Sequence, residues 1–323
     1  MGLLSIVVTA GAALIVVWLI WAEALQQRKD RSVPPPGRLV DVGGRHLHVL
    51  AKGEGPAVVL IAGGGEPGGF LSPLQDRLAT FTRVCTYDRP GFGWSQPSPS
   101  PMSFEAHARD LRAMLGEAGE HGPYVIVAES LGGLIARTFA RLFPTEVAGL
   151  VLVDAAEEEH IFSRMHVLKA AARQQMILVR ILRPLGLVRR AVHRALGRRY
   201  DPKTRRDLAA ALSRATHWDA AMQEIEAYQL TRASDRQAGG FGGFKGPLTV
   251  IAHGRPFQGP NAALEDGWRA GQERLRKLSP TAKFIVAEKA GHTIAQEDPG
   301  LVAEEVRQLL LAIELTSRPP RKS

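Results

Sequence analysis

The sequence predicts an α/β fold with a mostly parallel sheet and helices on both faces. Short apolar runs of the length of buried strands alternate along the chain with stretches of helical spacing. Three of these runs lead into features that suit chemistry: a glycine-rich loop at 63–69, Ser130 and Asp154. Because parallel strands end at the same edge of a sheet, we expect these features to lie close together.

The chain begins with an apolar segment, residues 3–22, that contains no charged side chain. About 20 such residues are the length that an α-helix needs to cross a bilayer. Trp18 and Trp21 lie near its far end, where a membrane interface would be. Three basic residues follow the segment: Arg28, Lys29 and Arg31. The positive-inside rule then places the body of the protein in the cytoplasm, behind a single-pass N-terminal anchor.

A cleaved signal peptide is the alternative interpretation of this segment, with Ala22-Glu23-Ala24 as the cleavage site. The segment has no basic region before the apolar run, however, and the run is long for a signal peptide. We therefore assign residues 1–31 to a membrane anchor and its flank. Residues 32–37 form a proline-rich linker that ends the anchor helix.

From residue 38 the pattern is that of strands. Residues 38–42 and 46–51 flank a Gly43-Gly44 turn and predict a hairpin. The continuous apolar run 57–62 predicts a strand buried on both faces, and it leads into the loop 63–69. This loop lacks the lysine of a phosphate-binding Walker loop, and a dinucleotide fingerprint would require a helix that opens directly from it. We interpret it as an oxyanion hole, with a flexible turn as the alternative.

Four polar residues near this region have structural interpretations. His46 and His48 alternate in the second hairpin strand, and we expect both to face solvent. Asp88 and Arg89 follow the strand 84–87, in a turn rich in glycine and proline. We expect them to hold this turn together by hydrogen bonds.

Residues 124–136 contain a strand, a sharp turn at Ser130 and the start of a helix. A nucleophilic serine on such a strained turn needs small residues two positions before and after it, and Ala128 and Gly132 stand there. Ala128 departs from the usual G-x-S-x-G pattern, although a methyl group is the smallest replacement for glycine. A serine that merely caps the helix is the alternative.

Further apolar and helical patterns complete the sheet. Strand 147–153 ends directly on Asp154, and His292 lies in a loop after the last strand. The other predicted elements are helices 104–115 and 131–142, strand 248–252, helix 262–278, strand 282–287 and helix 301–311.

The order of these motifs resembles the α/β-hydrolase superfamily over residues 38–155 and 246–314. The segments that carry the resemblance are VVLIAGGGEPGG, YDRPGFGWS, VIVAESLGG, LVLVD and AGHTIAQEDP. The resemblance implies the α/β-hydrolase fold and a catalytic triad in the chain order nucleophile, acid, histidine. Ser130 and His292 match the first and last positions, and Gly64 and Leu131 match the oxyanion hole.

The acid of the triad has three candidates. The superfamily places it after the sixth or the seventh strand, and Asp154 stands directly at the end of the sixth. After the seventh strand the first acids are Glu265 and Asp266, at or inside the next helix. We choose Asp154, with Asp266 and Glu265 as the alternatives.

Serine as the nucleophile predicts acyl transfer to water, whereas an aspartate in its place would point to epoxide or haloalkane hydrolysis. The predicted function is that of a membrane-anchored serine hydrolase that cleaves a lipophilic carboxylic ester through an acyl-enzyme. An acyltransferase with the same triad, a ligand-binding protein that retains the fold and a membrane-anchored interaction module are the alternatives.

Residues 156–245 interrupt the alternation at the place where the superfamily inserts a helical cap. Between Phe162 and Arg206 there are thirteen Lys or Arg residues and one acid, Asp201, interleaved with apolar residues. Such a basic amphipathic stretch binds anionic membrane surfaces, so we expect the cap to contact the membrane. A cap whose arginines are simply solvated is the alternative. Residues 315–323 form a basic tail.

Composition excludes several other classes of protein. The 323 residues, 45% hydrophobic, suit one sizeable domain with an insertion. Cys85 is the single cysteine, so no internal disulfide can form, and no Cys/His cluster has zinc-ligand spacing. The net charge of +9 is localised and belongs to no nucleic-acid-binding motif, so we expect neither a nucleic-acid partner nor a metal or other cofactor.

Overall fold

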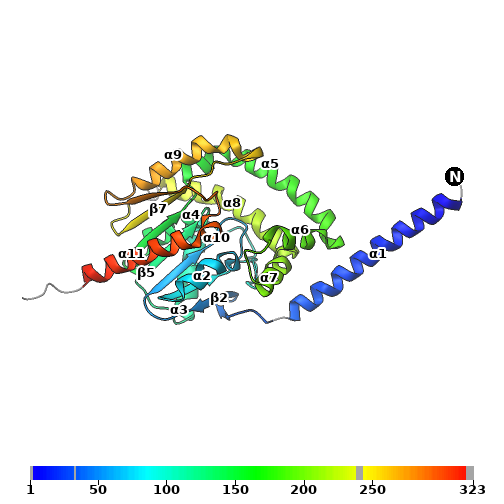
Figure 1. The fold of residues 1–323 in the computed structure, drawn as a ribbon, viewed down its shortest axis with the longest axis horizontal. Coiled ribbons are helices and arrows are strands. Elements are labelled where there is room, and N and C mark those ends of the chain that lie inside the picture. Colours follow the sequence, from blue (N-terminus) through cyan, green and yellow to red (C-terminus); the bar gives the residue numbers. More distant parts are fainter. Residues whose placement is uncertain (1–2, 33, 238–242, 318–323) are drawn as a thin grey trace, which may run out of the picture.

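A computed structural model describes residues 3–32, 34–237 and 243–317 of the chain. Helices cover a central sheet, and a long N-terminal helix extends away from this body (Figure 1). The predicted basic tail falls mostly outside the described residues, because only residues 315–317 are included, at the end of the last helix.

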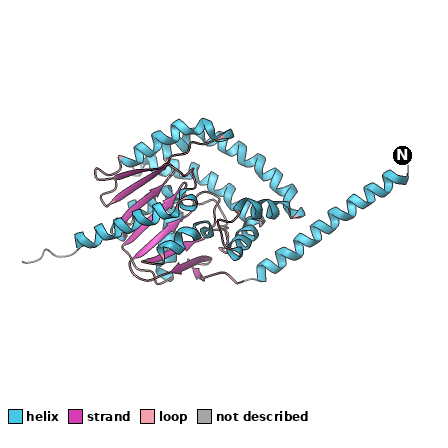
Figure 2. Cartoon of the chain, viewed as in Figure 1, coloured by secondary structure: helices cyan, strands magenta, loops and turns pink. Residues whose placement is uncertain are grey.

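Within the described residues the sheet has eight strands, in the order β1-β2-β4-β3-β5-β6-β7-β8. Figure 2 shows the strands in magenta, with the helices around them in cyan. β2 is antiparallel to both of its neighbours, and β3 to β8 pair in parallel. This arrangement confirms the predicted α/β class and the hairpin at its edge. The strands are β1 (Arg38–Asp41), β2 (His46–Lys52), β3 (Ala57–Ile61), β4 (Arg83–Tyr87), β5 (Tyr124–Glu129), β6 (Val147–Val153), β7 (Leu248–His253) and β8 (Lys283–Ala287).

The central strands are apolar throughout because both faces of the sheet are covered. Every residue of β3 and β5 is buried. Successive side chains of a strand point to opposite faces, so Val59 and Ile61 enter one core cluster while Val58 and Leu60 enter the other. A continuous apolar run is therefore what such a strand requires.

Each of these two clusters includes its own set of helices. α3 (Phe104–Glu117), α4 (Gly132–Leu142) and α9 (Glu265–Arg276) supply buried residues to the cluster of Val59. The opposite cluster includes residues of α2 (Ser72–Leu78), α10 (Ile294–Glu297) and α11 (Pro299–Ser317). Short 3-10 turns cover Gly68–Leu71 (η1), Pro144–Glu146 (η2) and Gly259–Leu264 (η4).

The helix predicted over 262–278 is shorter than expected. Its first residues belong to η4, and α9 starts at Glu265. Glu265 and Asp266 lie in the first turn of α9, where negative side chains interact favourably with the helix dipole.

In the described part of the segment between β6 and β7, which was predicted as a cap, there are four helices. They are α5 (Glu158–Leu182), α6 (Leu187–Leu196), α7 (Pro202–Leu212) and α8 (Ala215–Gln237), with the turn η3 (Arg183–Leu185) before α6. Tyr200 donates a hydrogen bond to the Phe70 carbonyl (3.2 Å). Arg214 donates one to the Gly93 carbonyl (2.6 Å). Because these partners lie in the loops after β3 and β4, this segment, called the cap segment below, contacts the loops at the carboxyl ends of these two strands.

The N-terminal helix α1 (Leu3–Ser32) is the one helix among the described residues that is long and apolar enough to cross a membrane. From residue 8 to residue 30 its side chains are mostly exposed, and Leu14, for example, is 70% exposed. Near its end, Glu23 and Asp30 form ion pairs with Arg189 of α6, at 3.0 and 2.7 Å. These contacts attach the end of α1 to the cap segment.

Candidate active site

Ser130 lies on a strained turn between β5 and α4. Its φ of 52° is in the left-handed region, which is unusual for a residue other than glycine. Its backbone N–H donates to the Val153 carbonyl (3.1 Å), and its carbonyl accepts from the Ala156 N–H (2.8 Å). A Cβ on Gly132 would lie 2.5 Å from the Ile61 carbonyl oxygen, so this position requires glycine. These contacts therefore hold the backbone of Ser130 in its strained conformation, at the carboxyl ends of the strands.

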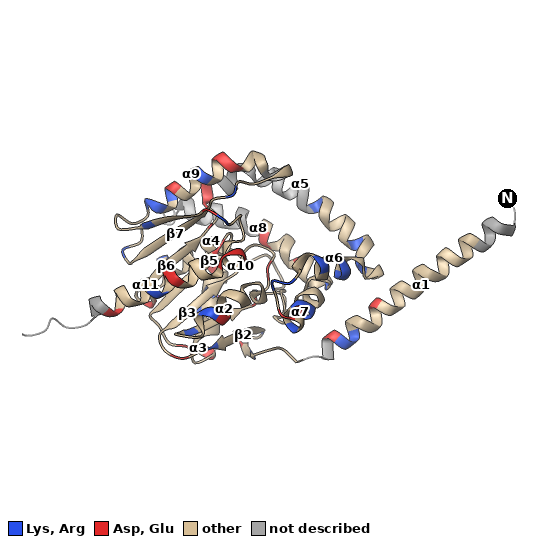
Figure 3. Ribbon diagram, viewed as in Figure 1, with Lys and Arg blue, Asp and Glu red and all other residues tan. Residues whose placement is uncertain are grey.

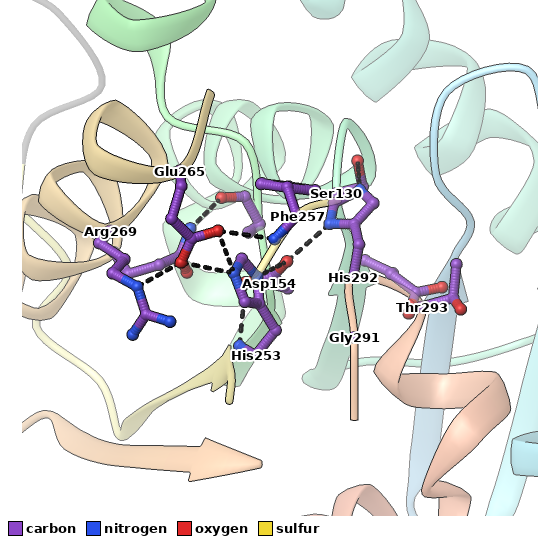
Figure 4. A network of polar contacts seen from close by, with 12 residues as sticks. Ser130, Asp154, His253, Phe257, Glu265, Arg269, Gly291, His292 and Thr293 are labelled. Atoms are coloured by element: carbon purple, nitrogen blue, oxygen red, sulfur yellow. Dashed lines mark hydrogen bonds and ion pairs between the residues drawn. The ribbon is translucent and has the colours of Figure 1, made fainter. Parts of the chain in front are cut away.

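His292 lies between β8 and α10, in contact with both Ser130 and Asp154 (Figure 4). Its Nε2 is 3.0 Å from Ser130 Oγ, and its Nδ1 is 2.6 Å from Asp154 Oδ2. The carboxylate favours a proton on Nδ1, which leaves Nε2 free to accept the serine proton. The Trp268 ring packs edge-on against the imidazole, with ring centroids 4.9 Å apart.

Asp154 follows β6 and is completely buried. Its φ is 41°, so it shares with Ser130 a left-handed backbone conformation, and these two are the only such residues besides glycines in the described part of the chain. Its backbone N–H donates to the Ile251 carbonyl (2.7 Å), which fixes it at the end of the sheet. Burial alone would raise the pKa of Asp154, but hydrogen bonds from His253 and His292 outweigh burial and lower the pKa below its ordinary value. The carboxylate is therefore held ionised.

A second histidine, His253, contacts the same carboxylate and was missed by the sequence analysis. Its Nδ1 is 2.8 Å from Asp154 Oδ2, and its backbone N–H donates to Asp154 Oδ1 (3.2 Å). Its Nε2 is 3.2 Å from a carboxylate oxygen of Glu265. Burial opposes protonation of the ring, but the hydrogen bonds to the two carboxylates outweigh it and raise the pKa of His253. Both ring nitrogens face acceptors, which is the environment of an imidazolium cation.

The alternative acids lie elsewhere. Glu265 accepts hydrogen bonds from the Phe257 N–H (2.8 Å) and from Arg269, and it contacts His253 on the side away from Asp154 (Figure 4). Asp266 is exposed on α9. Within the described residues, Asp154 is thus the one of the three candidates that contacts His292.

The loop after β3 is held rigidly by a buried arginine. Arg89 donates to the carbonyls of Ala62 (2.8 Å) and Gly63 (2.6 Å) and forms an ion pair with Glu224 of α8. Glu224 in turn accepts from the Gly65 N–H (2.9 Å). The loop is therefore fixed from the sheet and from the cap segment. The hydrogen bonds of the Arg89 side chain hold this loop after β3, whereas the sequence predicted that they hold the turn in which Arg89 itself lies.

Gly64 and Leu131 lie side by side at this edge. A Cβ on Gly64 would be 3.3 Å from the Leu131 side chain. In the described part of the chain, neither the Gly64 N–H nor the Leu131 N–H has an intramolecular hydrogen-bond partner. Two backbone donors are thus available beside Ser130, as an oxyanion hole requires.

Asp88 supports the neighbouring loop. Its carboxylate accepts from the N–H groups of Gly68 (2.8 Å) and Trp94 (3.0 Å), as expected for a residue that holds the turn together. It also lies 2.8 Å from Nδ1 of His48, which is buried. The expectation that His48 faces solvent is therefore wrong, because this partner draws it inward, whereas His46 is exposed as expected.

A buried carboxyl connects the serine turn to the histidine loop. Glu129, which precedes Ser130, accepts from the Ala295 N–H (3.0 Å) and from the Gln296 side chain (3.2 Å), both in α10. Burial raises the pKa of Glu129 well above its ordinary value, and the nearby Glu66 raises it further. These hydrogen bonds fix the distance between the strand of Ser130 and the loop of His292.

The side chains of Asp154, His253 and His292 offer three potential metal ligands within 4.8 Å of one another. Both histidine Nδ1 atoms lie within 2.8 Å of one carboxylate oxygen, however. Tetrahedral zinc, with bonds of about 2.0 Å to each ligand, would hold the ligand atoms about 3.3 Å apart. The observed spacing is that of a hydrogen-bonded chain.

Comparisons with known proteins agree with this fold. A protein-family model described as alpha/beta hydrolase fold matches residues 56–199. An uncharacterized protein of Schizosaccharomyces pombe is 28% identical over 241 residues, which cover 72% of this chain and 42% of that protein. A vacuolar membrane protein of Saccharomyces cerevisiae is 34% identical over 115 residues, 34% of this chain and 18% of that protein.

A pimeloyl-(acyl-carrier protein) methyl ester esterase of Shewanella is 33% identical over 110 residues, 34% of this chain and 39% of that enzyme. The chain thus spans less than half the length of these curated relatives.

Two solved structures cover most of the chain. A thermophilic esterase from Thermogutta terrifontis has a TM-score of 0.61 and 21% identity, over 85% of this chain and 98% of its own. A putative epoxide hydrolase from Pseudomonas aeruginosa has a TM-score of 0.67 and 20% identity, over 88% and 100%. Together with the family model over residues 56–199, these structures show that the chain has the α/β-hydrolase fold.

Proposed function

We propose that the chain is a serine hydrolase that cleaves a carboxylic ester through a triad of Ser130, His292 and Asp154. The observation that carries this proposal is the unbroken chain of contacts from Ser130 Oγ to His292 and on to the buried Asp154. Two of the three residues stand at strained backbone positions, which proteins retain mainly at functional sites. An esterase among the sequence relatives supports the reaction class.

The geometry suits acyl transfer in two steps. Ser130 Oγ attacks the ester carbonyl while His292 Nε2 accepts its proton, and Asp154 stabilises the imidazolium that forms. The N–H groups of Gly64 and Leu131 donate to the oxyanion of the tetrahedral intermediate. His292 then gives its proton to the leaving alcohol, and an acyl-enzyme remains on Ser130. Water activated by His292 attacks this ester and releases the acid.

The proposed substrate is a lipophilic ester that the protein meets at a membrane. Support comes from α1, which has the length and composition of a membrane span. The end of α5 next to η3 also presents apolar side chains to the outside, and Ile177, Leu178 and Ile181 are each more than half exposed. η3 packs against α1, so this apolar surface lies at the same end of the molecule as the proposed anchor.

Membrane anchoring has a direct test. The full chain should remain in the membrane fraction after an alkaline carbonate wash, because the apolar segment 3–22 can be removed from the bilayer only with detergent. Deletion of residues 3–22 should release the protein, and replacement of the segment by an unrelated apolar helix of equal length should restore retention. Release of the full chain by carbonate would contradict an anchor.

His253 should stabilise the protein in a pH-dependent way. Its folded-state pKa is raised above the unfolded value, so its contribution is complete below about pH 6.5 and is lost as the pH rises through the folded-state pKa. The free energy of unfolding of His253→Gln, measured with urea from about pH 6 to about pH 9, should approach that of the unmodified protein as the pH rises. His121→Gln, at an exposed position before β5, is the control. A difference that does not change with pH would contradict the imidazolium assignment.

A further inference from the structure

A basic cavity lies apart from the candidate active site, at the junction of α1 with α6 and α7. Its volume is about 750 Å³, and residues from the end of α1, from α6 and α7, and Trp94 and Arg214 line it. Nine lysine or arginine side chains and two acidic ones surround it, a surplus of seven positive charges. Figure 3 shows the basic residues gathered on α6 and α7 beside the end of α1.

Some of these cations have partners in the protein. Arg189 pairs with Glu23 and Asp30, and Lys203 pairs with Asp207. Four arginines have neither an ion pair nor a side-chain hydrogen bond within the described part of the chain, and all are exposed: Arg190, Arg194, Arg198 and Arg206. Like charges held around one cavity repel each other, and a bound anion relieves this repulsion.

Arginine favours one kind of anion in particular. The planar guanidinium presents paired N–H donors that match two oxygens of a phosphate, whereas a lysine ammonium interacts with an anion as a point charge. A cluster of arginines therefore favours phosphate. Trp94 and the stems of the arginines add apolar wall to the cavity. The lining therefore suits a phosphate that is attached to an organic group.

The position of the cavity indicates where this phosphate comes from. Gln26, Lys29 and Asp30 of α1 line it, and they lie four to eight residues beyond the end of the apolar segment at Ala22. At the rise of an α-helix this is about 6 to 12 Å. The headgroup layer of a bilayer is about 5 to 8 Å thick, so the cavity opens at or just outside the headgroups.

We propose that this cavity binds the phosphate-bearing headgroup of an anionic membrane lipid. The choice of a lipid as the source rests on the proposed anchoring by α1, whereas the phosphate chemistry rests on the arginines alone. Such binding holds the cap segment against the membrane, at the end of the molecule where α1 leaves it. The site is distinct from the Ser130 centre and requires no turnover there.

Thermal unfolding of the full chain in an uncharged detergent tests the proposal. Short-chain phosphatidylglycerol should raise the Tm, because a ligand that binds only the folded state stabilises it. Short-chain phosphatidylcholine should not raise it. Inorganic pyrophosphate at the same concentration should have a much smaller effect.

Replacement of Arg190, Arg194, Arg198 and Arg206 by glutamine should weaken phosphatidylglycerol binding about tenfold or more, since each cation near an anionic headgroup contributes to the attraction. Arg189 is left unchanged because it holds α1 in place.

The matched control removes the same four charges from exposed positions outside the cavity: Arg77, Arg109, Lys277 and Lys289, each replaced by glutamine. Its response to phosphatidylglycerol should equal that of the unmodified protein. An equally reduced Tm response to phosphatidylglycerol in both variants would indicate general charge attraction and would overturn the proposed site. An equal Tm rise with pyrophosphate would overturn the lipid source and leave a soluble phosphate ligand.

Native mass spectrometry of the unmodified chain gives a measurement that needs no variant. Released from nanodiscs of mixed phosphatidylcholine and phosphatidylglycerol, the protein should retain phosphatidylglycerol selectively. Retention of both lipids in their bulk ratio would overturn the proposal. The carbonate wash tests the anchor separately, so failure of the anchor and failure of the cavity can be told apart.

Discussion

Replacement of Ser130 or His292 by alanine is expected to lower kcat/KM for ester hydrolysis by about a thousandfold or more, because the two residues act as one catalytic unit. Ser130 supplies the attacking oxygen, and His292 Nε2, 3.0 Å away, supplies the base. The double variant should lose no more than either single variant. Turnover of a p-nitrophenyl ester by the purified variants measures the effect, and circular dichroism checks that each variant is folded.

Ser100→Ala and His121→Ala are the matched controls for these two variants. Both residues are exposed, and neither touches the triad. Their activity should stay within a few fold of the unmodified protein. The triad assignment fails if Ser130→Ala or His292→Ala also retains activity within a few fold.

Replacement of Asp154 by asparagine should lower turnover by about two to four orders of magnitude. The side-chain amide can donate to His292 Nδ1, which favours the tautomer with its proton on Nε2, and this nitrogen then cannot accept the proton of Ser130. The same substitution weakens the contact with His253, so a modest loss of stability should accompany the loss of activity.

The two alternative acids provide the comparison for Asp154. Asp266→Asn should leave turnover unchanged, because Asp266 is exposed on α9. Glu265→Gln should have a small effect, which acts through His253 and the Phe257 N–H that Glu265 binds. A larger loss from either substitution than from Asp154→Asn would move the acid of the triad to the loop after β7.

Much of the fold could be predicted from the sequence because each central strand can be recognised from a short stretch of consecutive residues. β3 and β5 are buried on both faces, and a strand in that position must be apolar at every residue, which makes it visible as a continuous run. Ser130 and His292 could be located for a similar reason. Each follows a strand and lies in a short segment with glycine at a fixed place.

Contacts between distant segments carried no comparable signal. His253 directly follows the strand predicted over 248–252 and was given no role. In the structure it is the last residue of β7, and the pairing of β7 with β6 brings it to Asp154. Asp154 follows β6, and β7 is the neighbouring strand. A polar residue at the end of that neighbouring strand is the signal that could have revealed the role of His253. The ion pair of Arg89 with Glu224 joins residues 135 positions apart, and no local pattern predicts such a pairing.

The basic segment illustrates the same limit. Its charge was evident from composition. Which of its arginines form ion pairs within the protein, and which line the cavity without one, could not be predicted. Arg189 pairs with α1, whereas Arg190, the next residue in the chain, lines the cavity without an ion-pair partner in the described part of the chain. This difference depends on where α1 packs, which the charge pattern alone does not specify.

Labelling with a fluorophosphonate probe tests the proposed catalytic function most directly, because the probe forms a stable adduct only with a serine that a neighbouring base activates. Peptide mapping of the labelled full chain should place one adduct on Ser130. Labelling should disappear in Ser130→Ala, fall strongly in His292→Ala and persist in Ser100→Ala. An unlabelled protein, or an adduct on another serine that survives in Ser130→Ala, would contradict the assignment of Ser130 as the nucleophile.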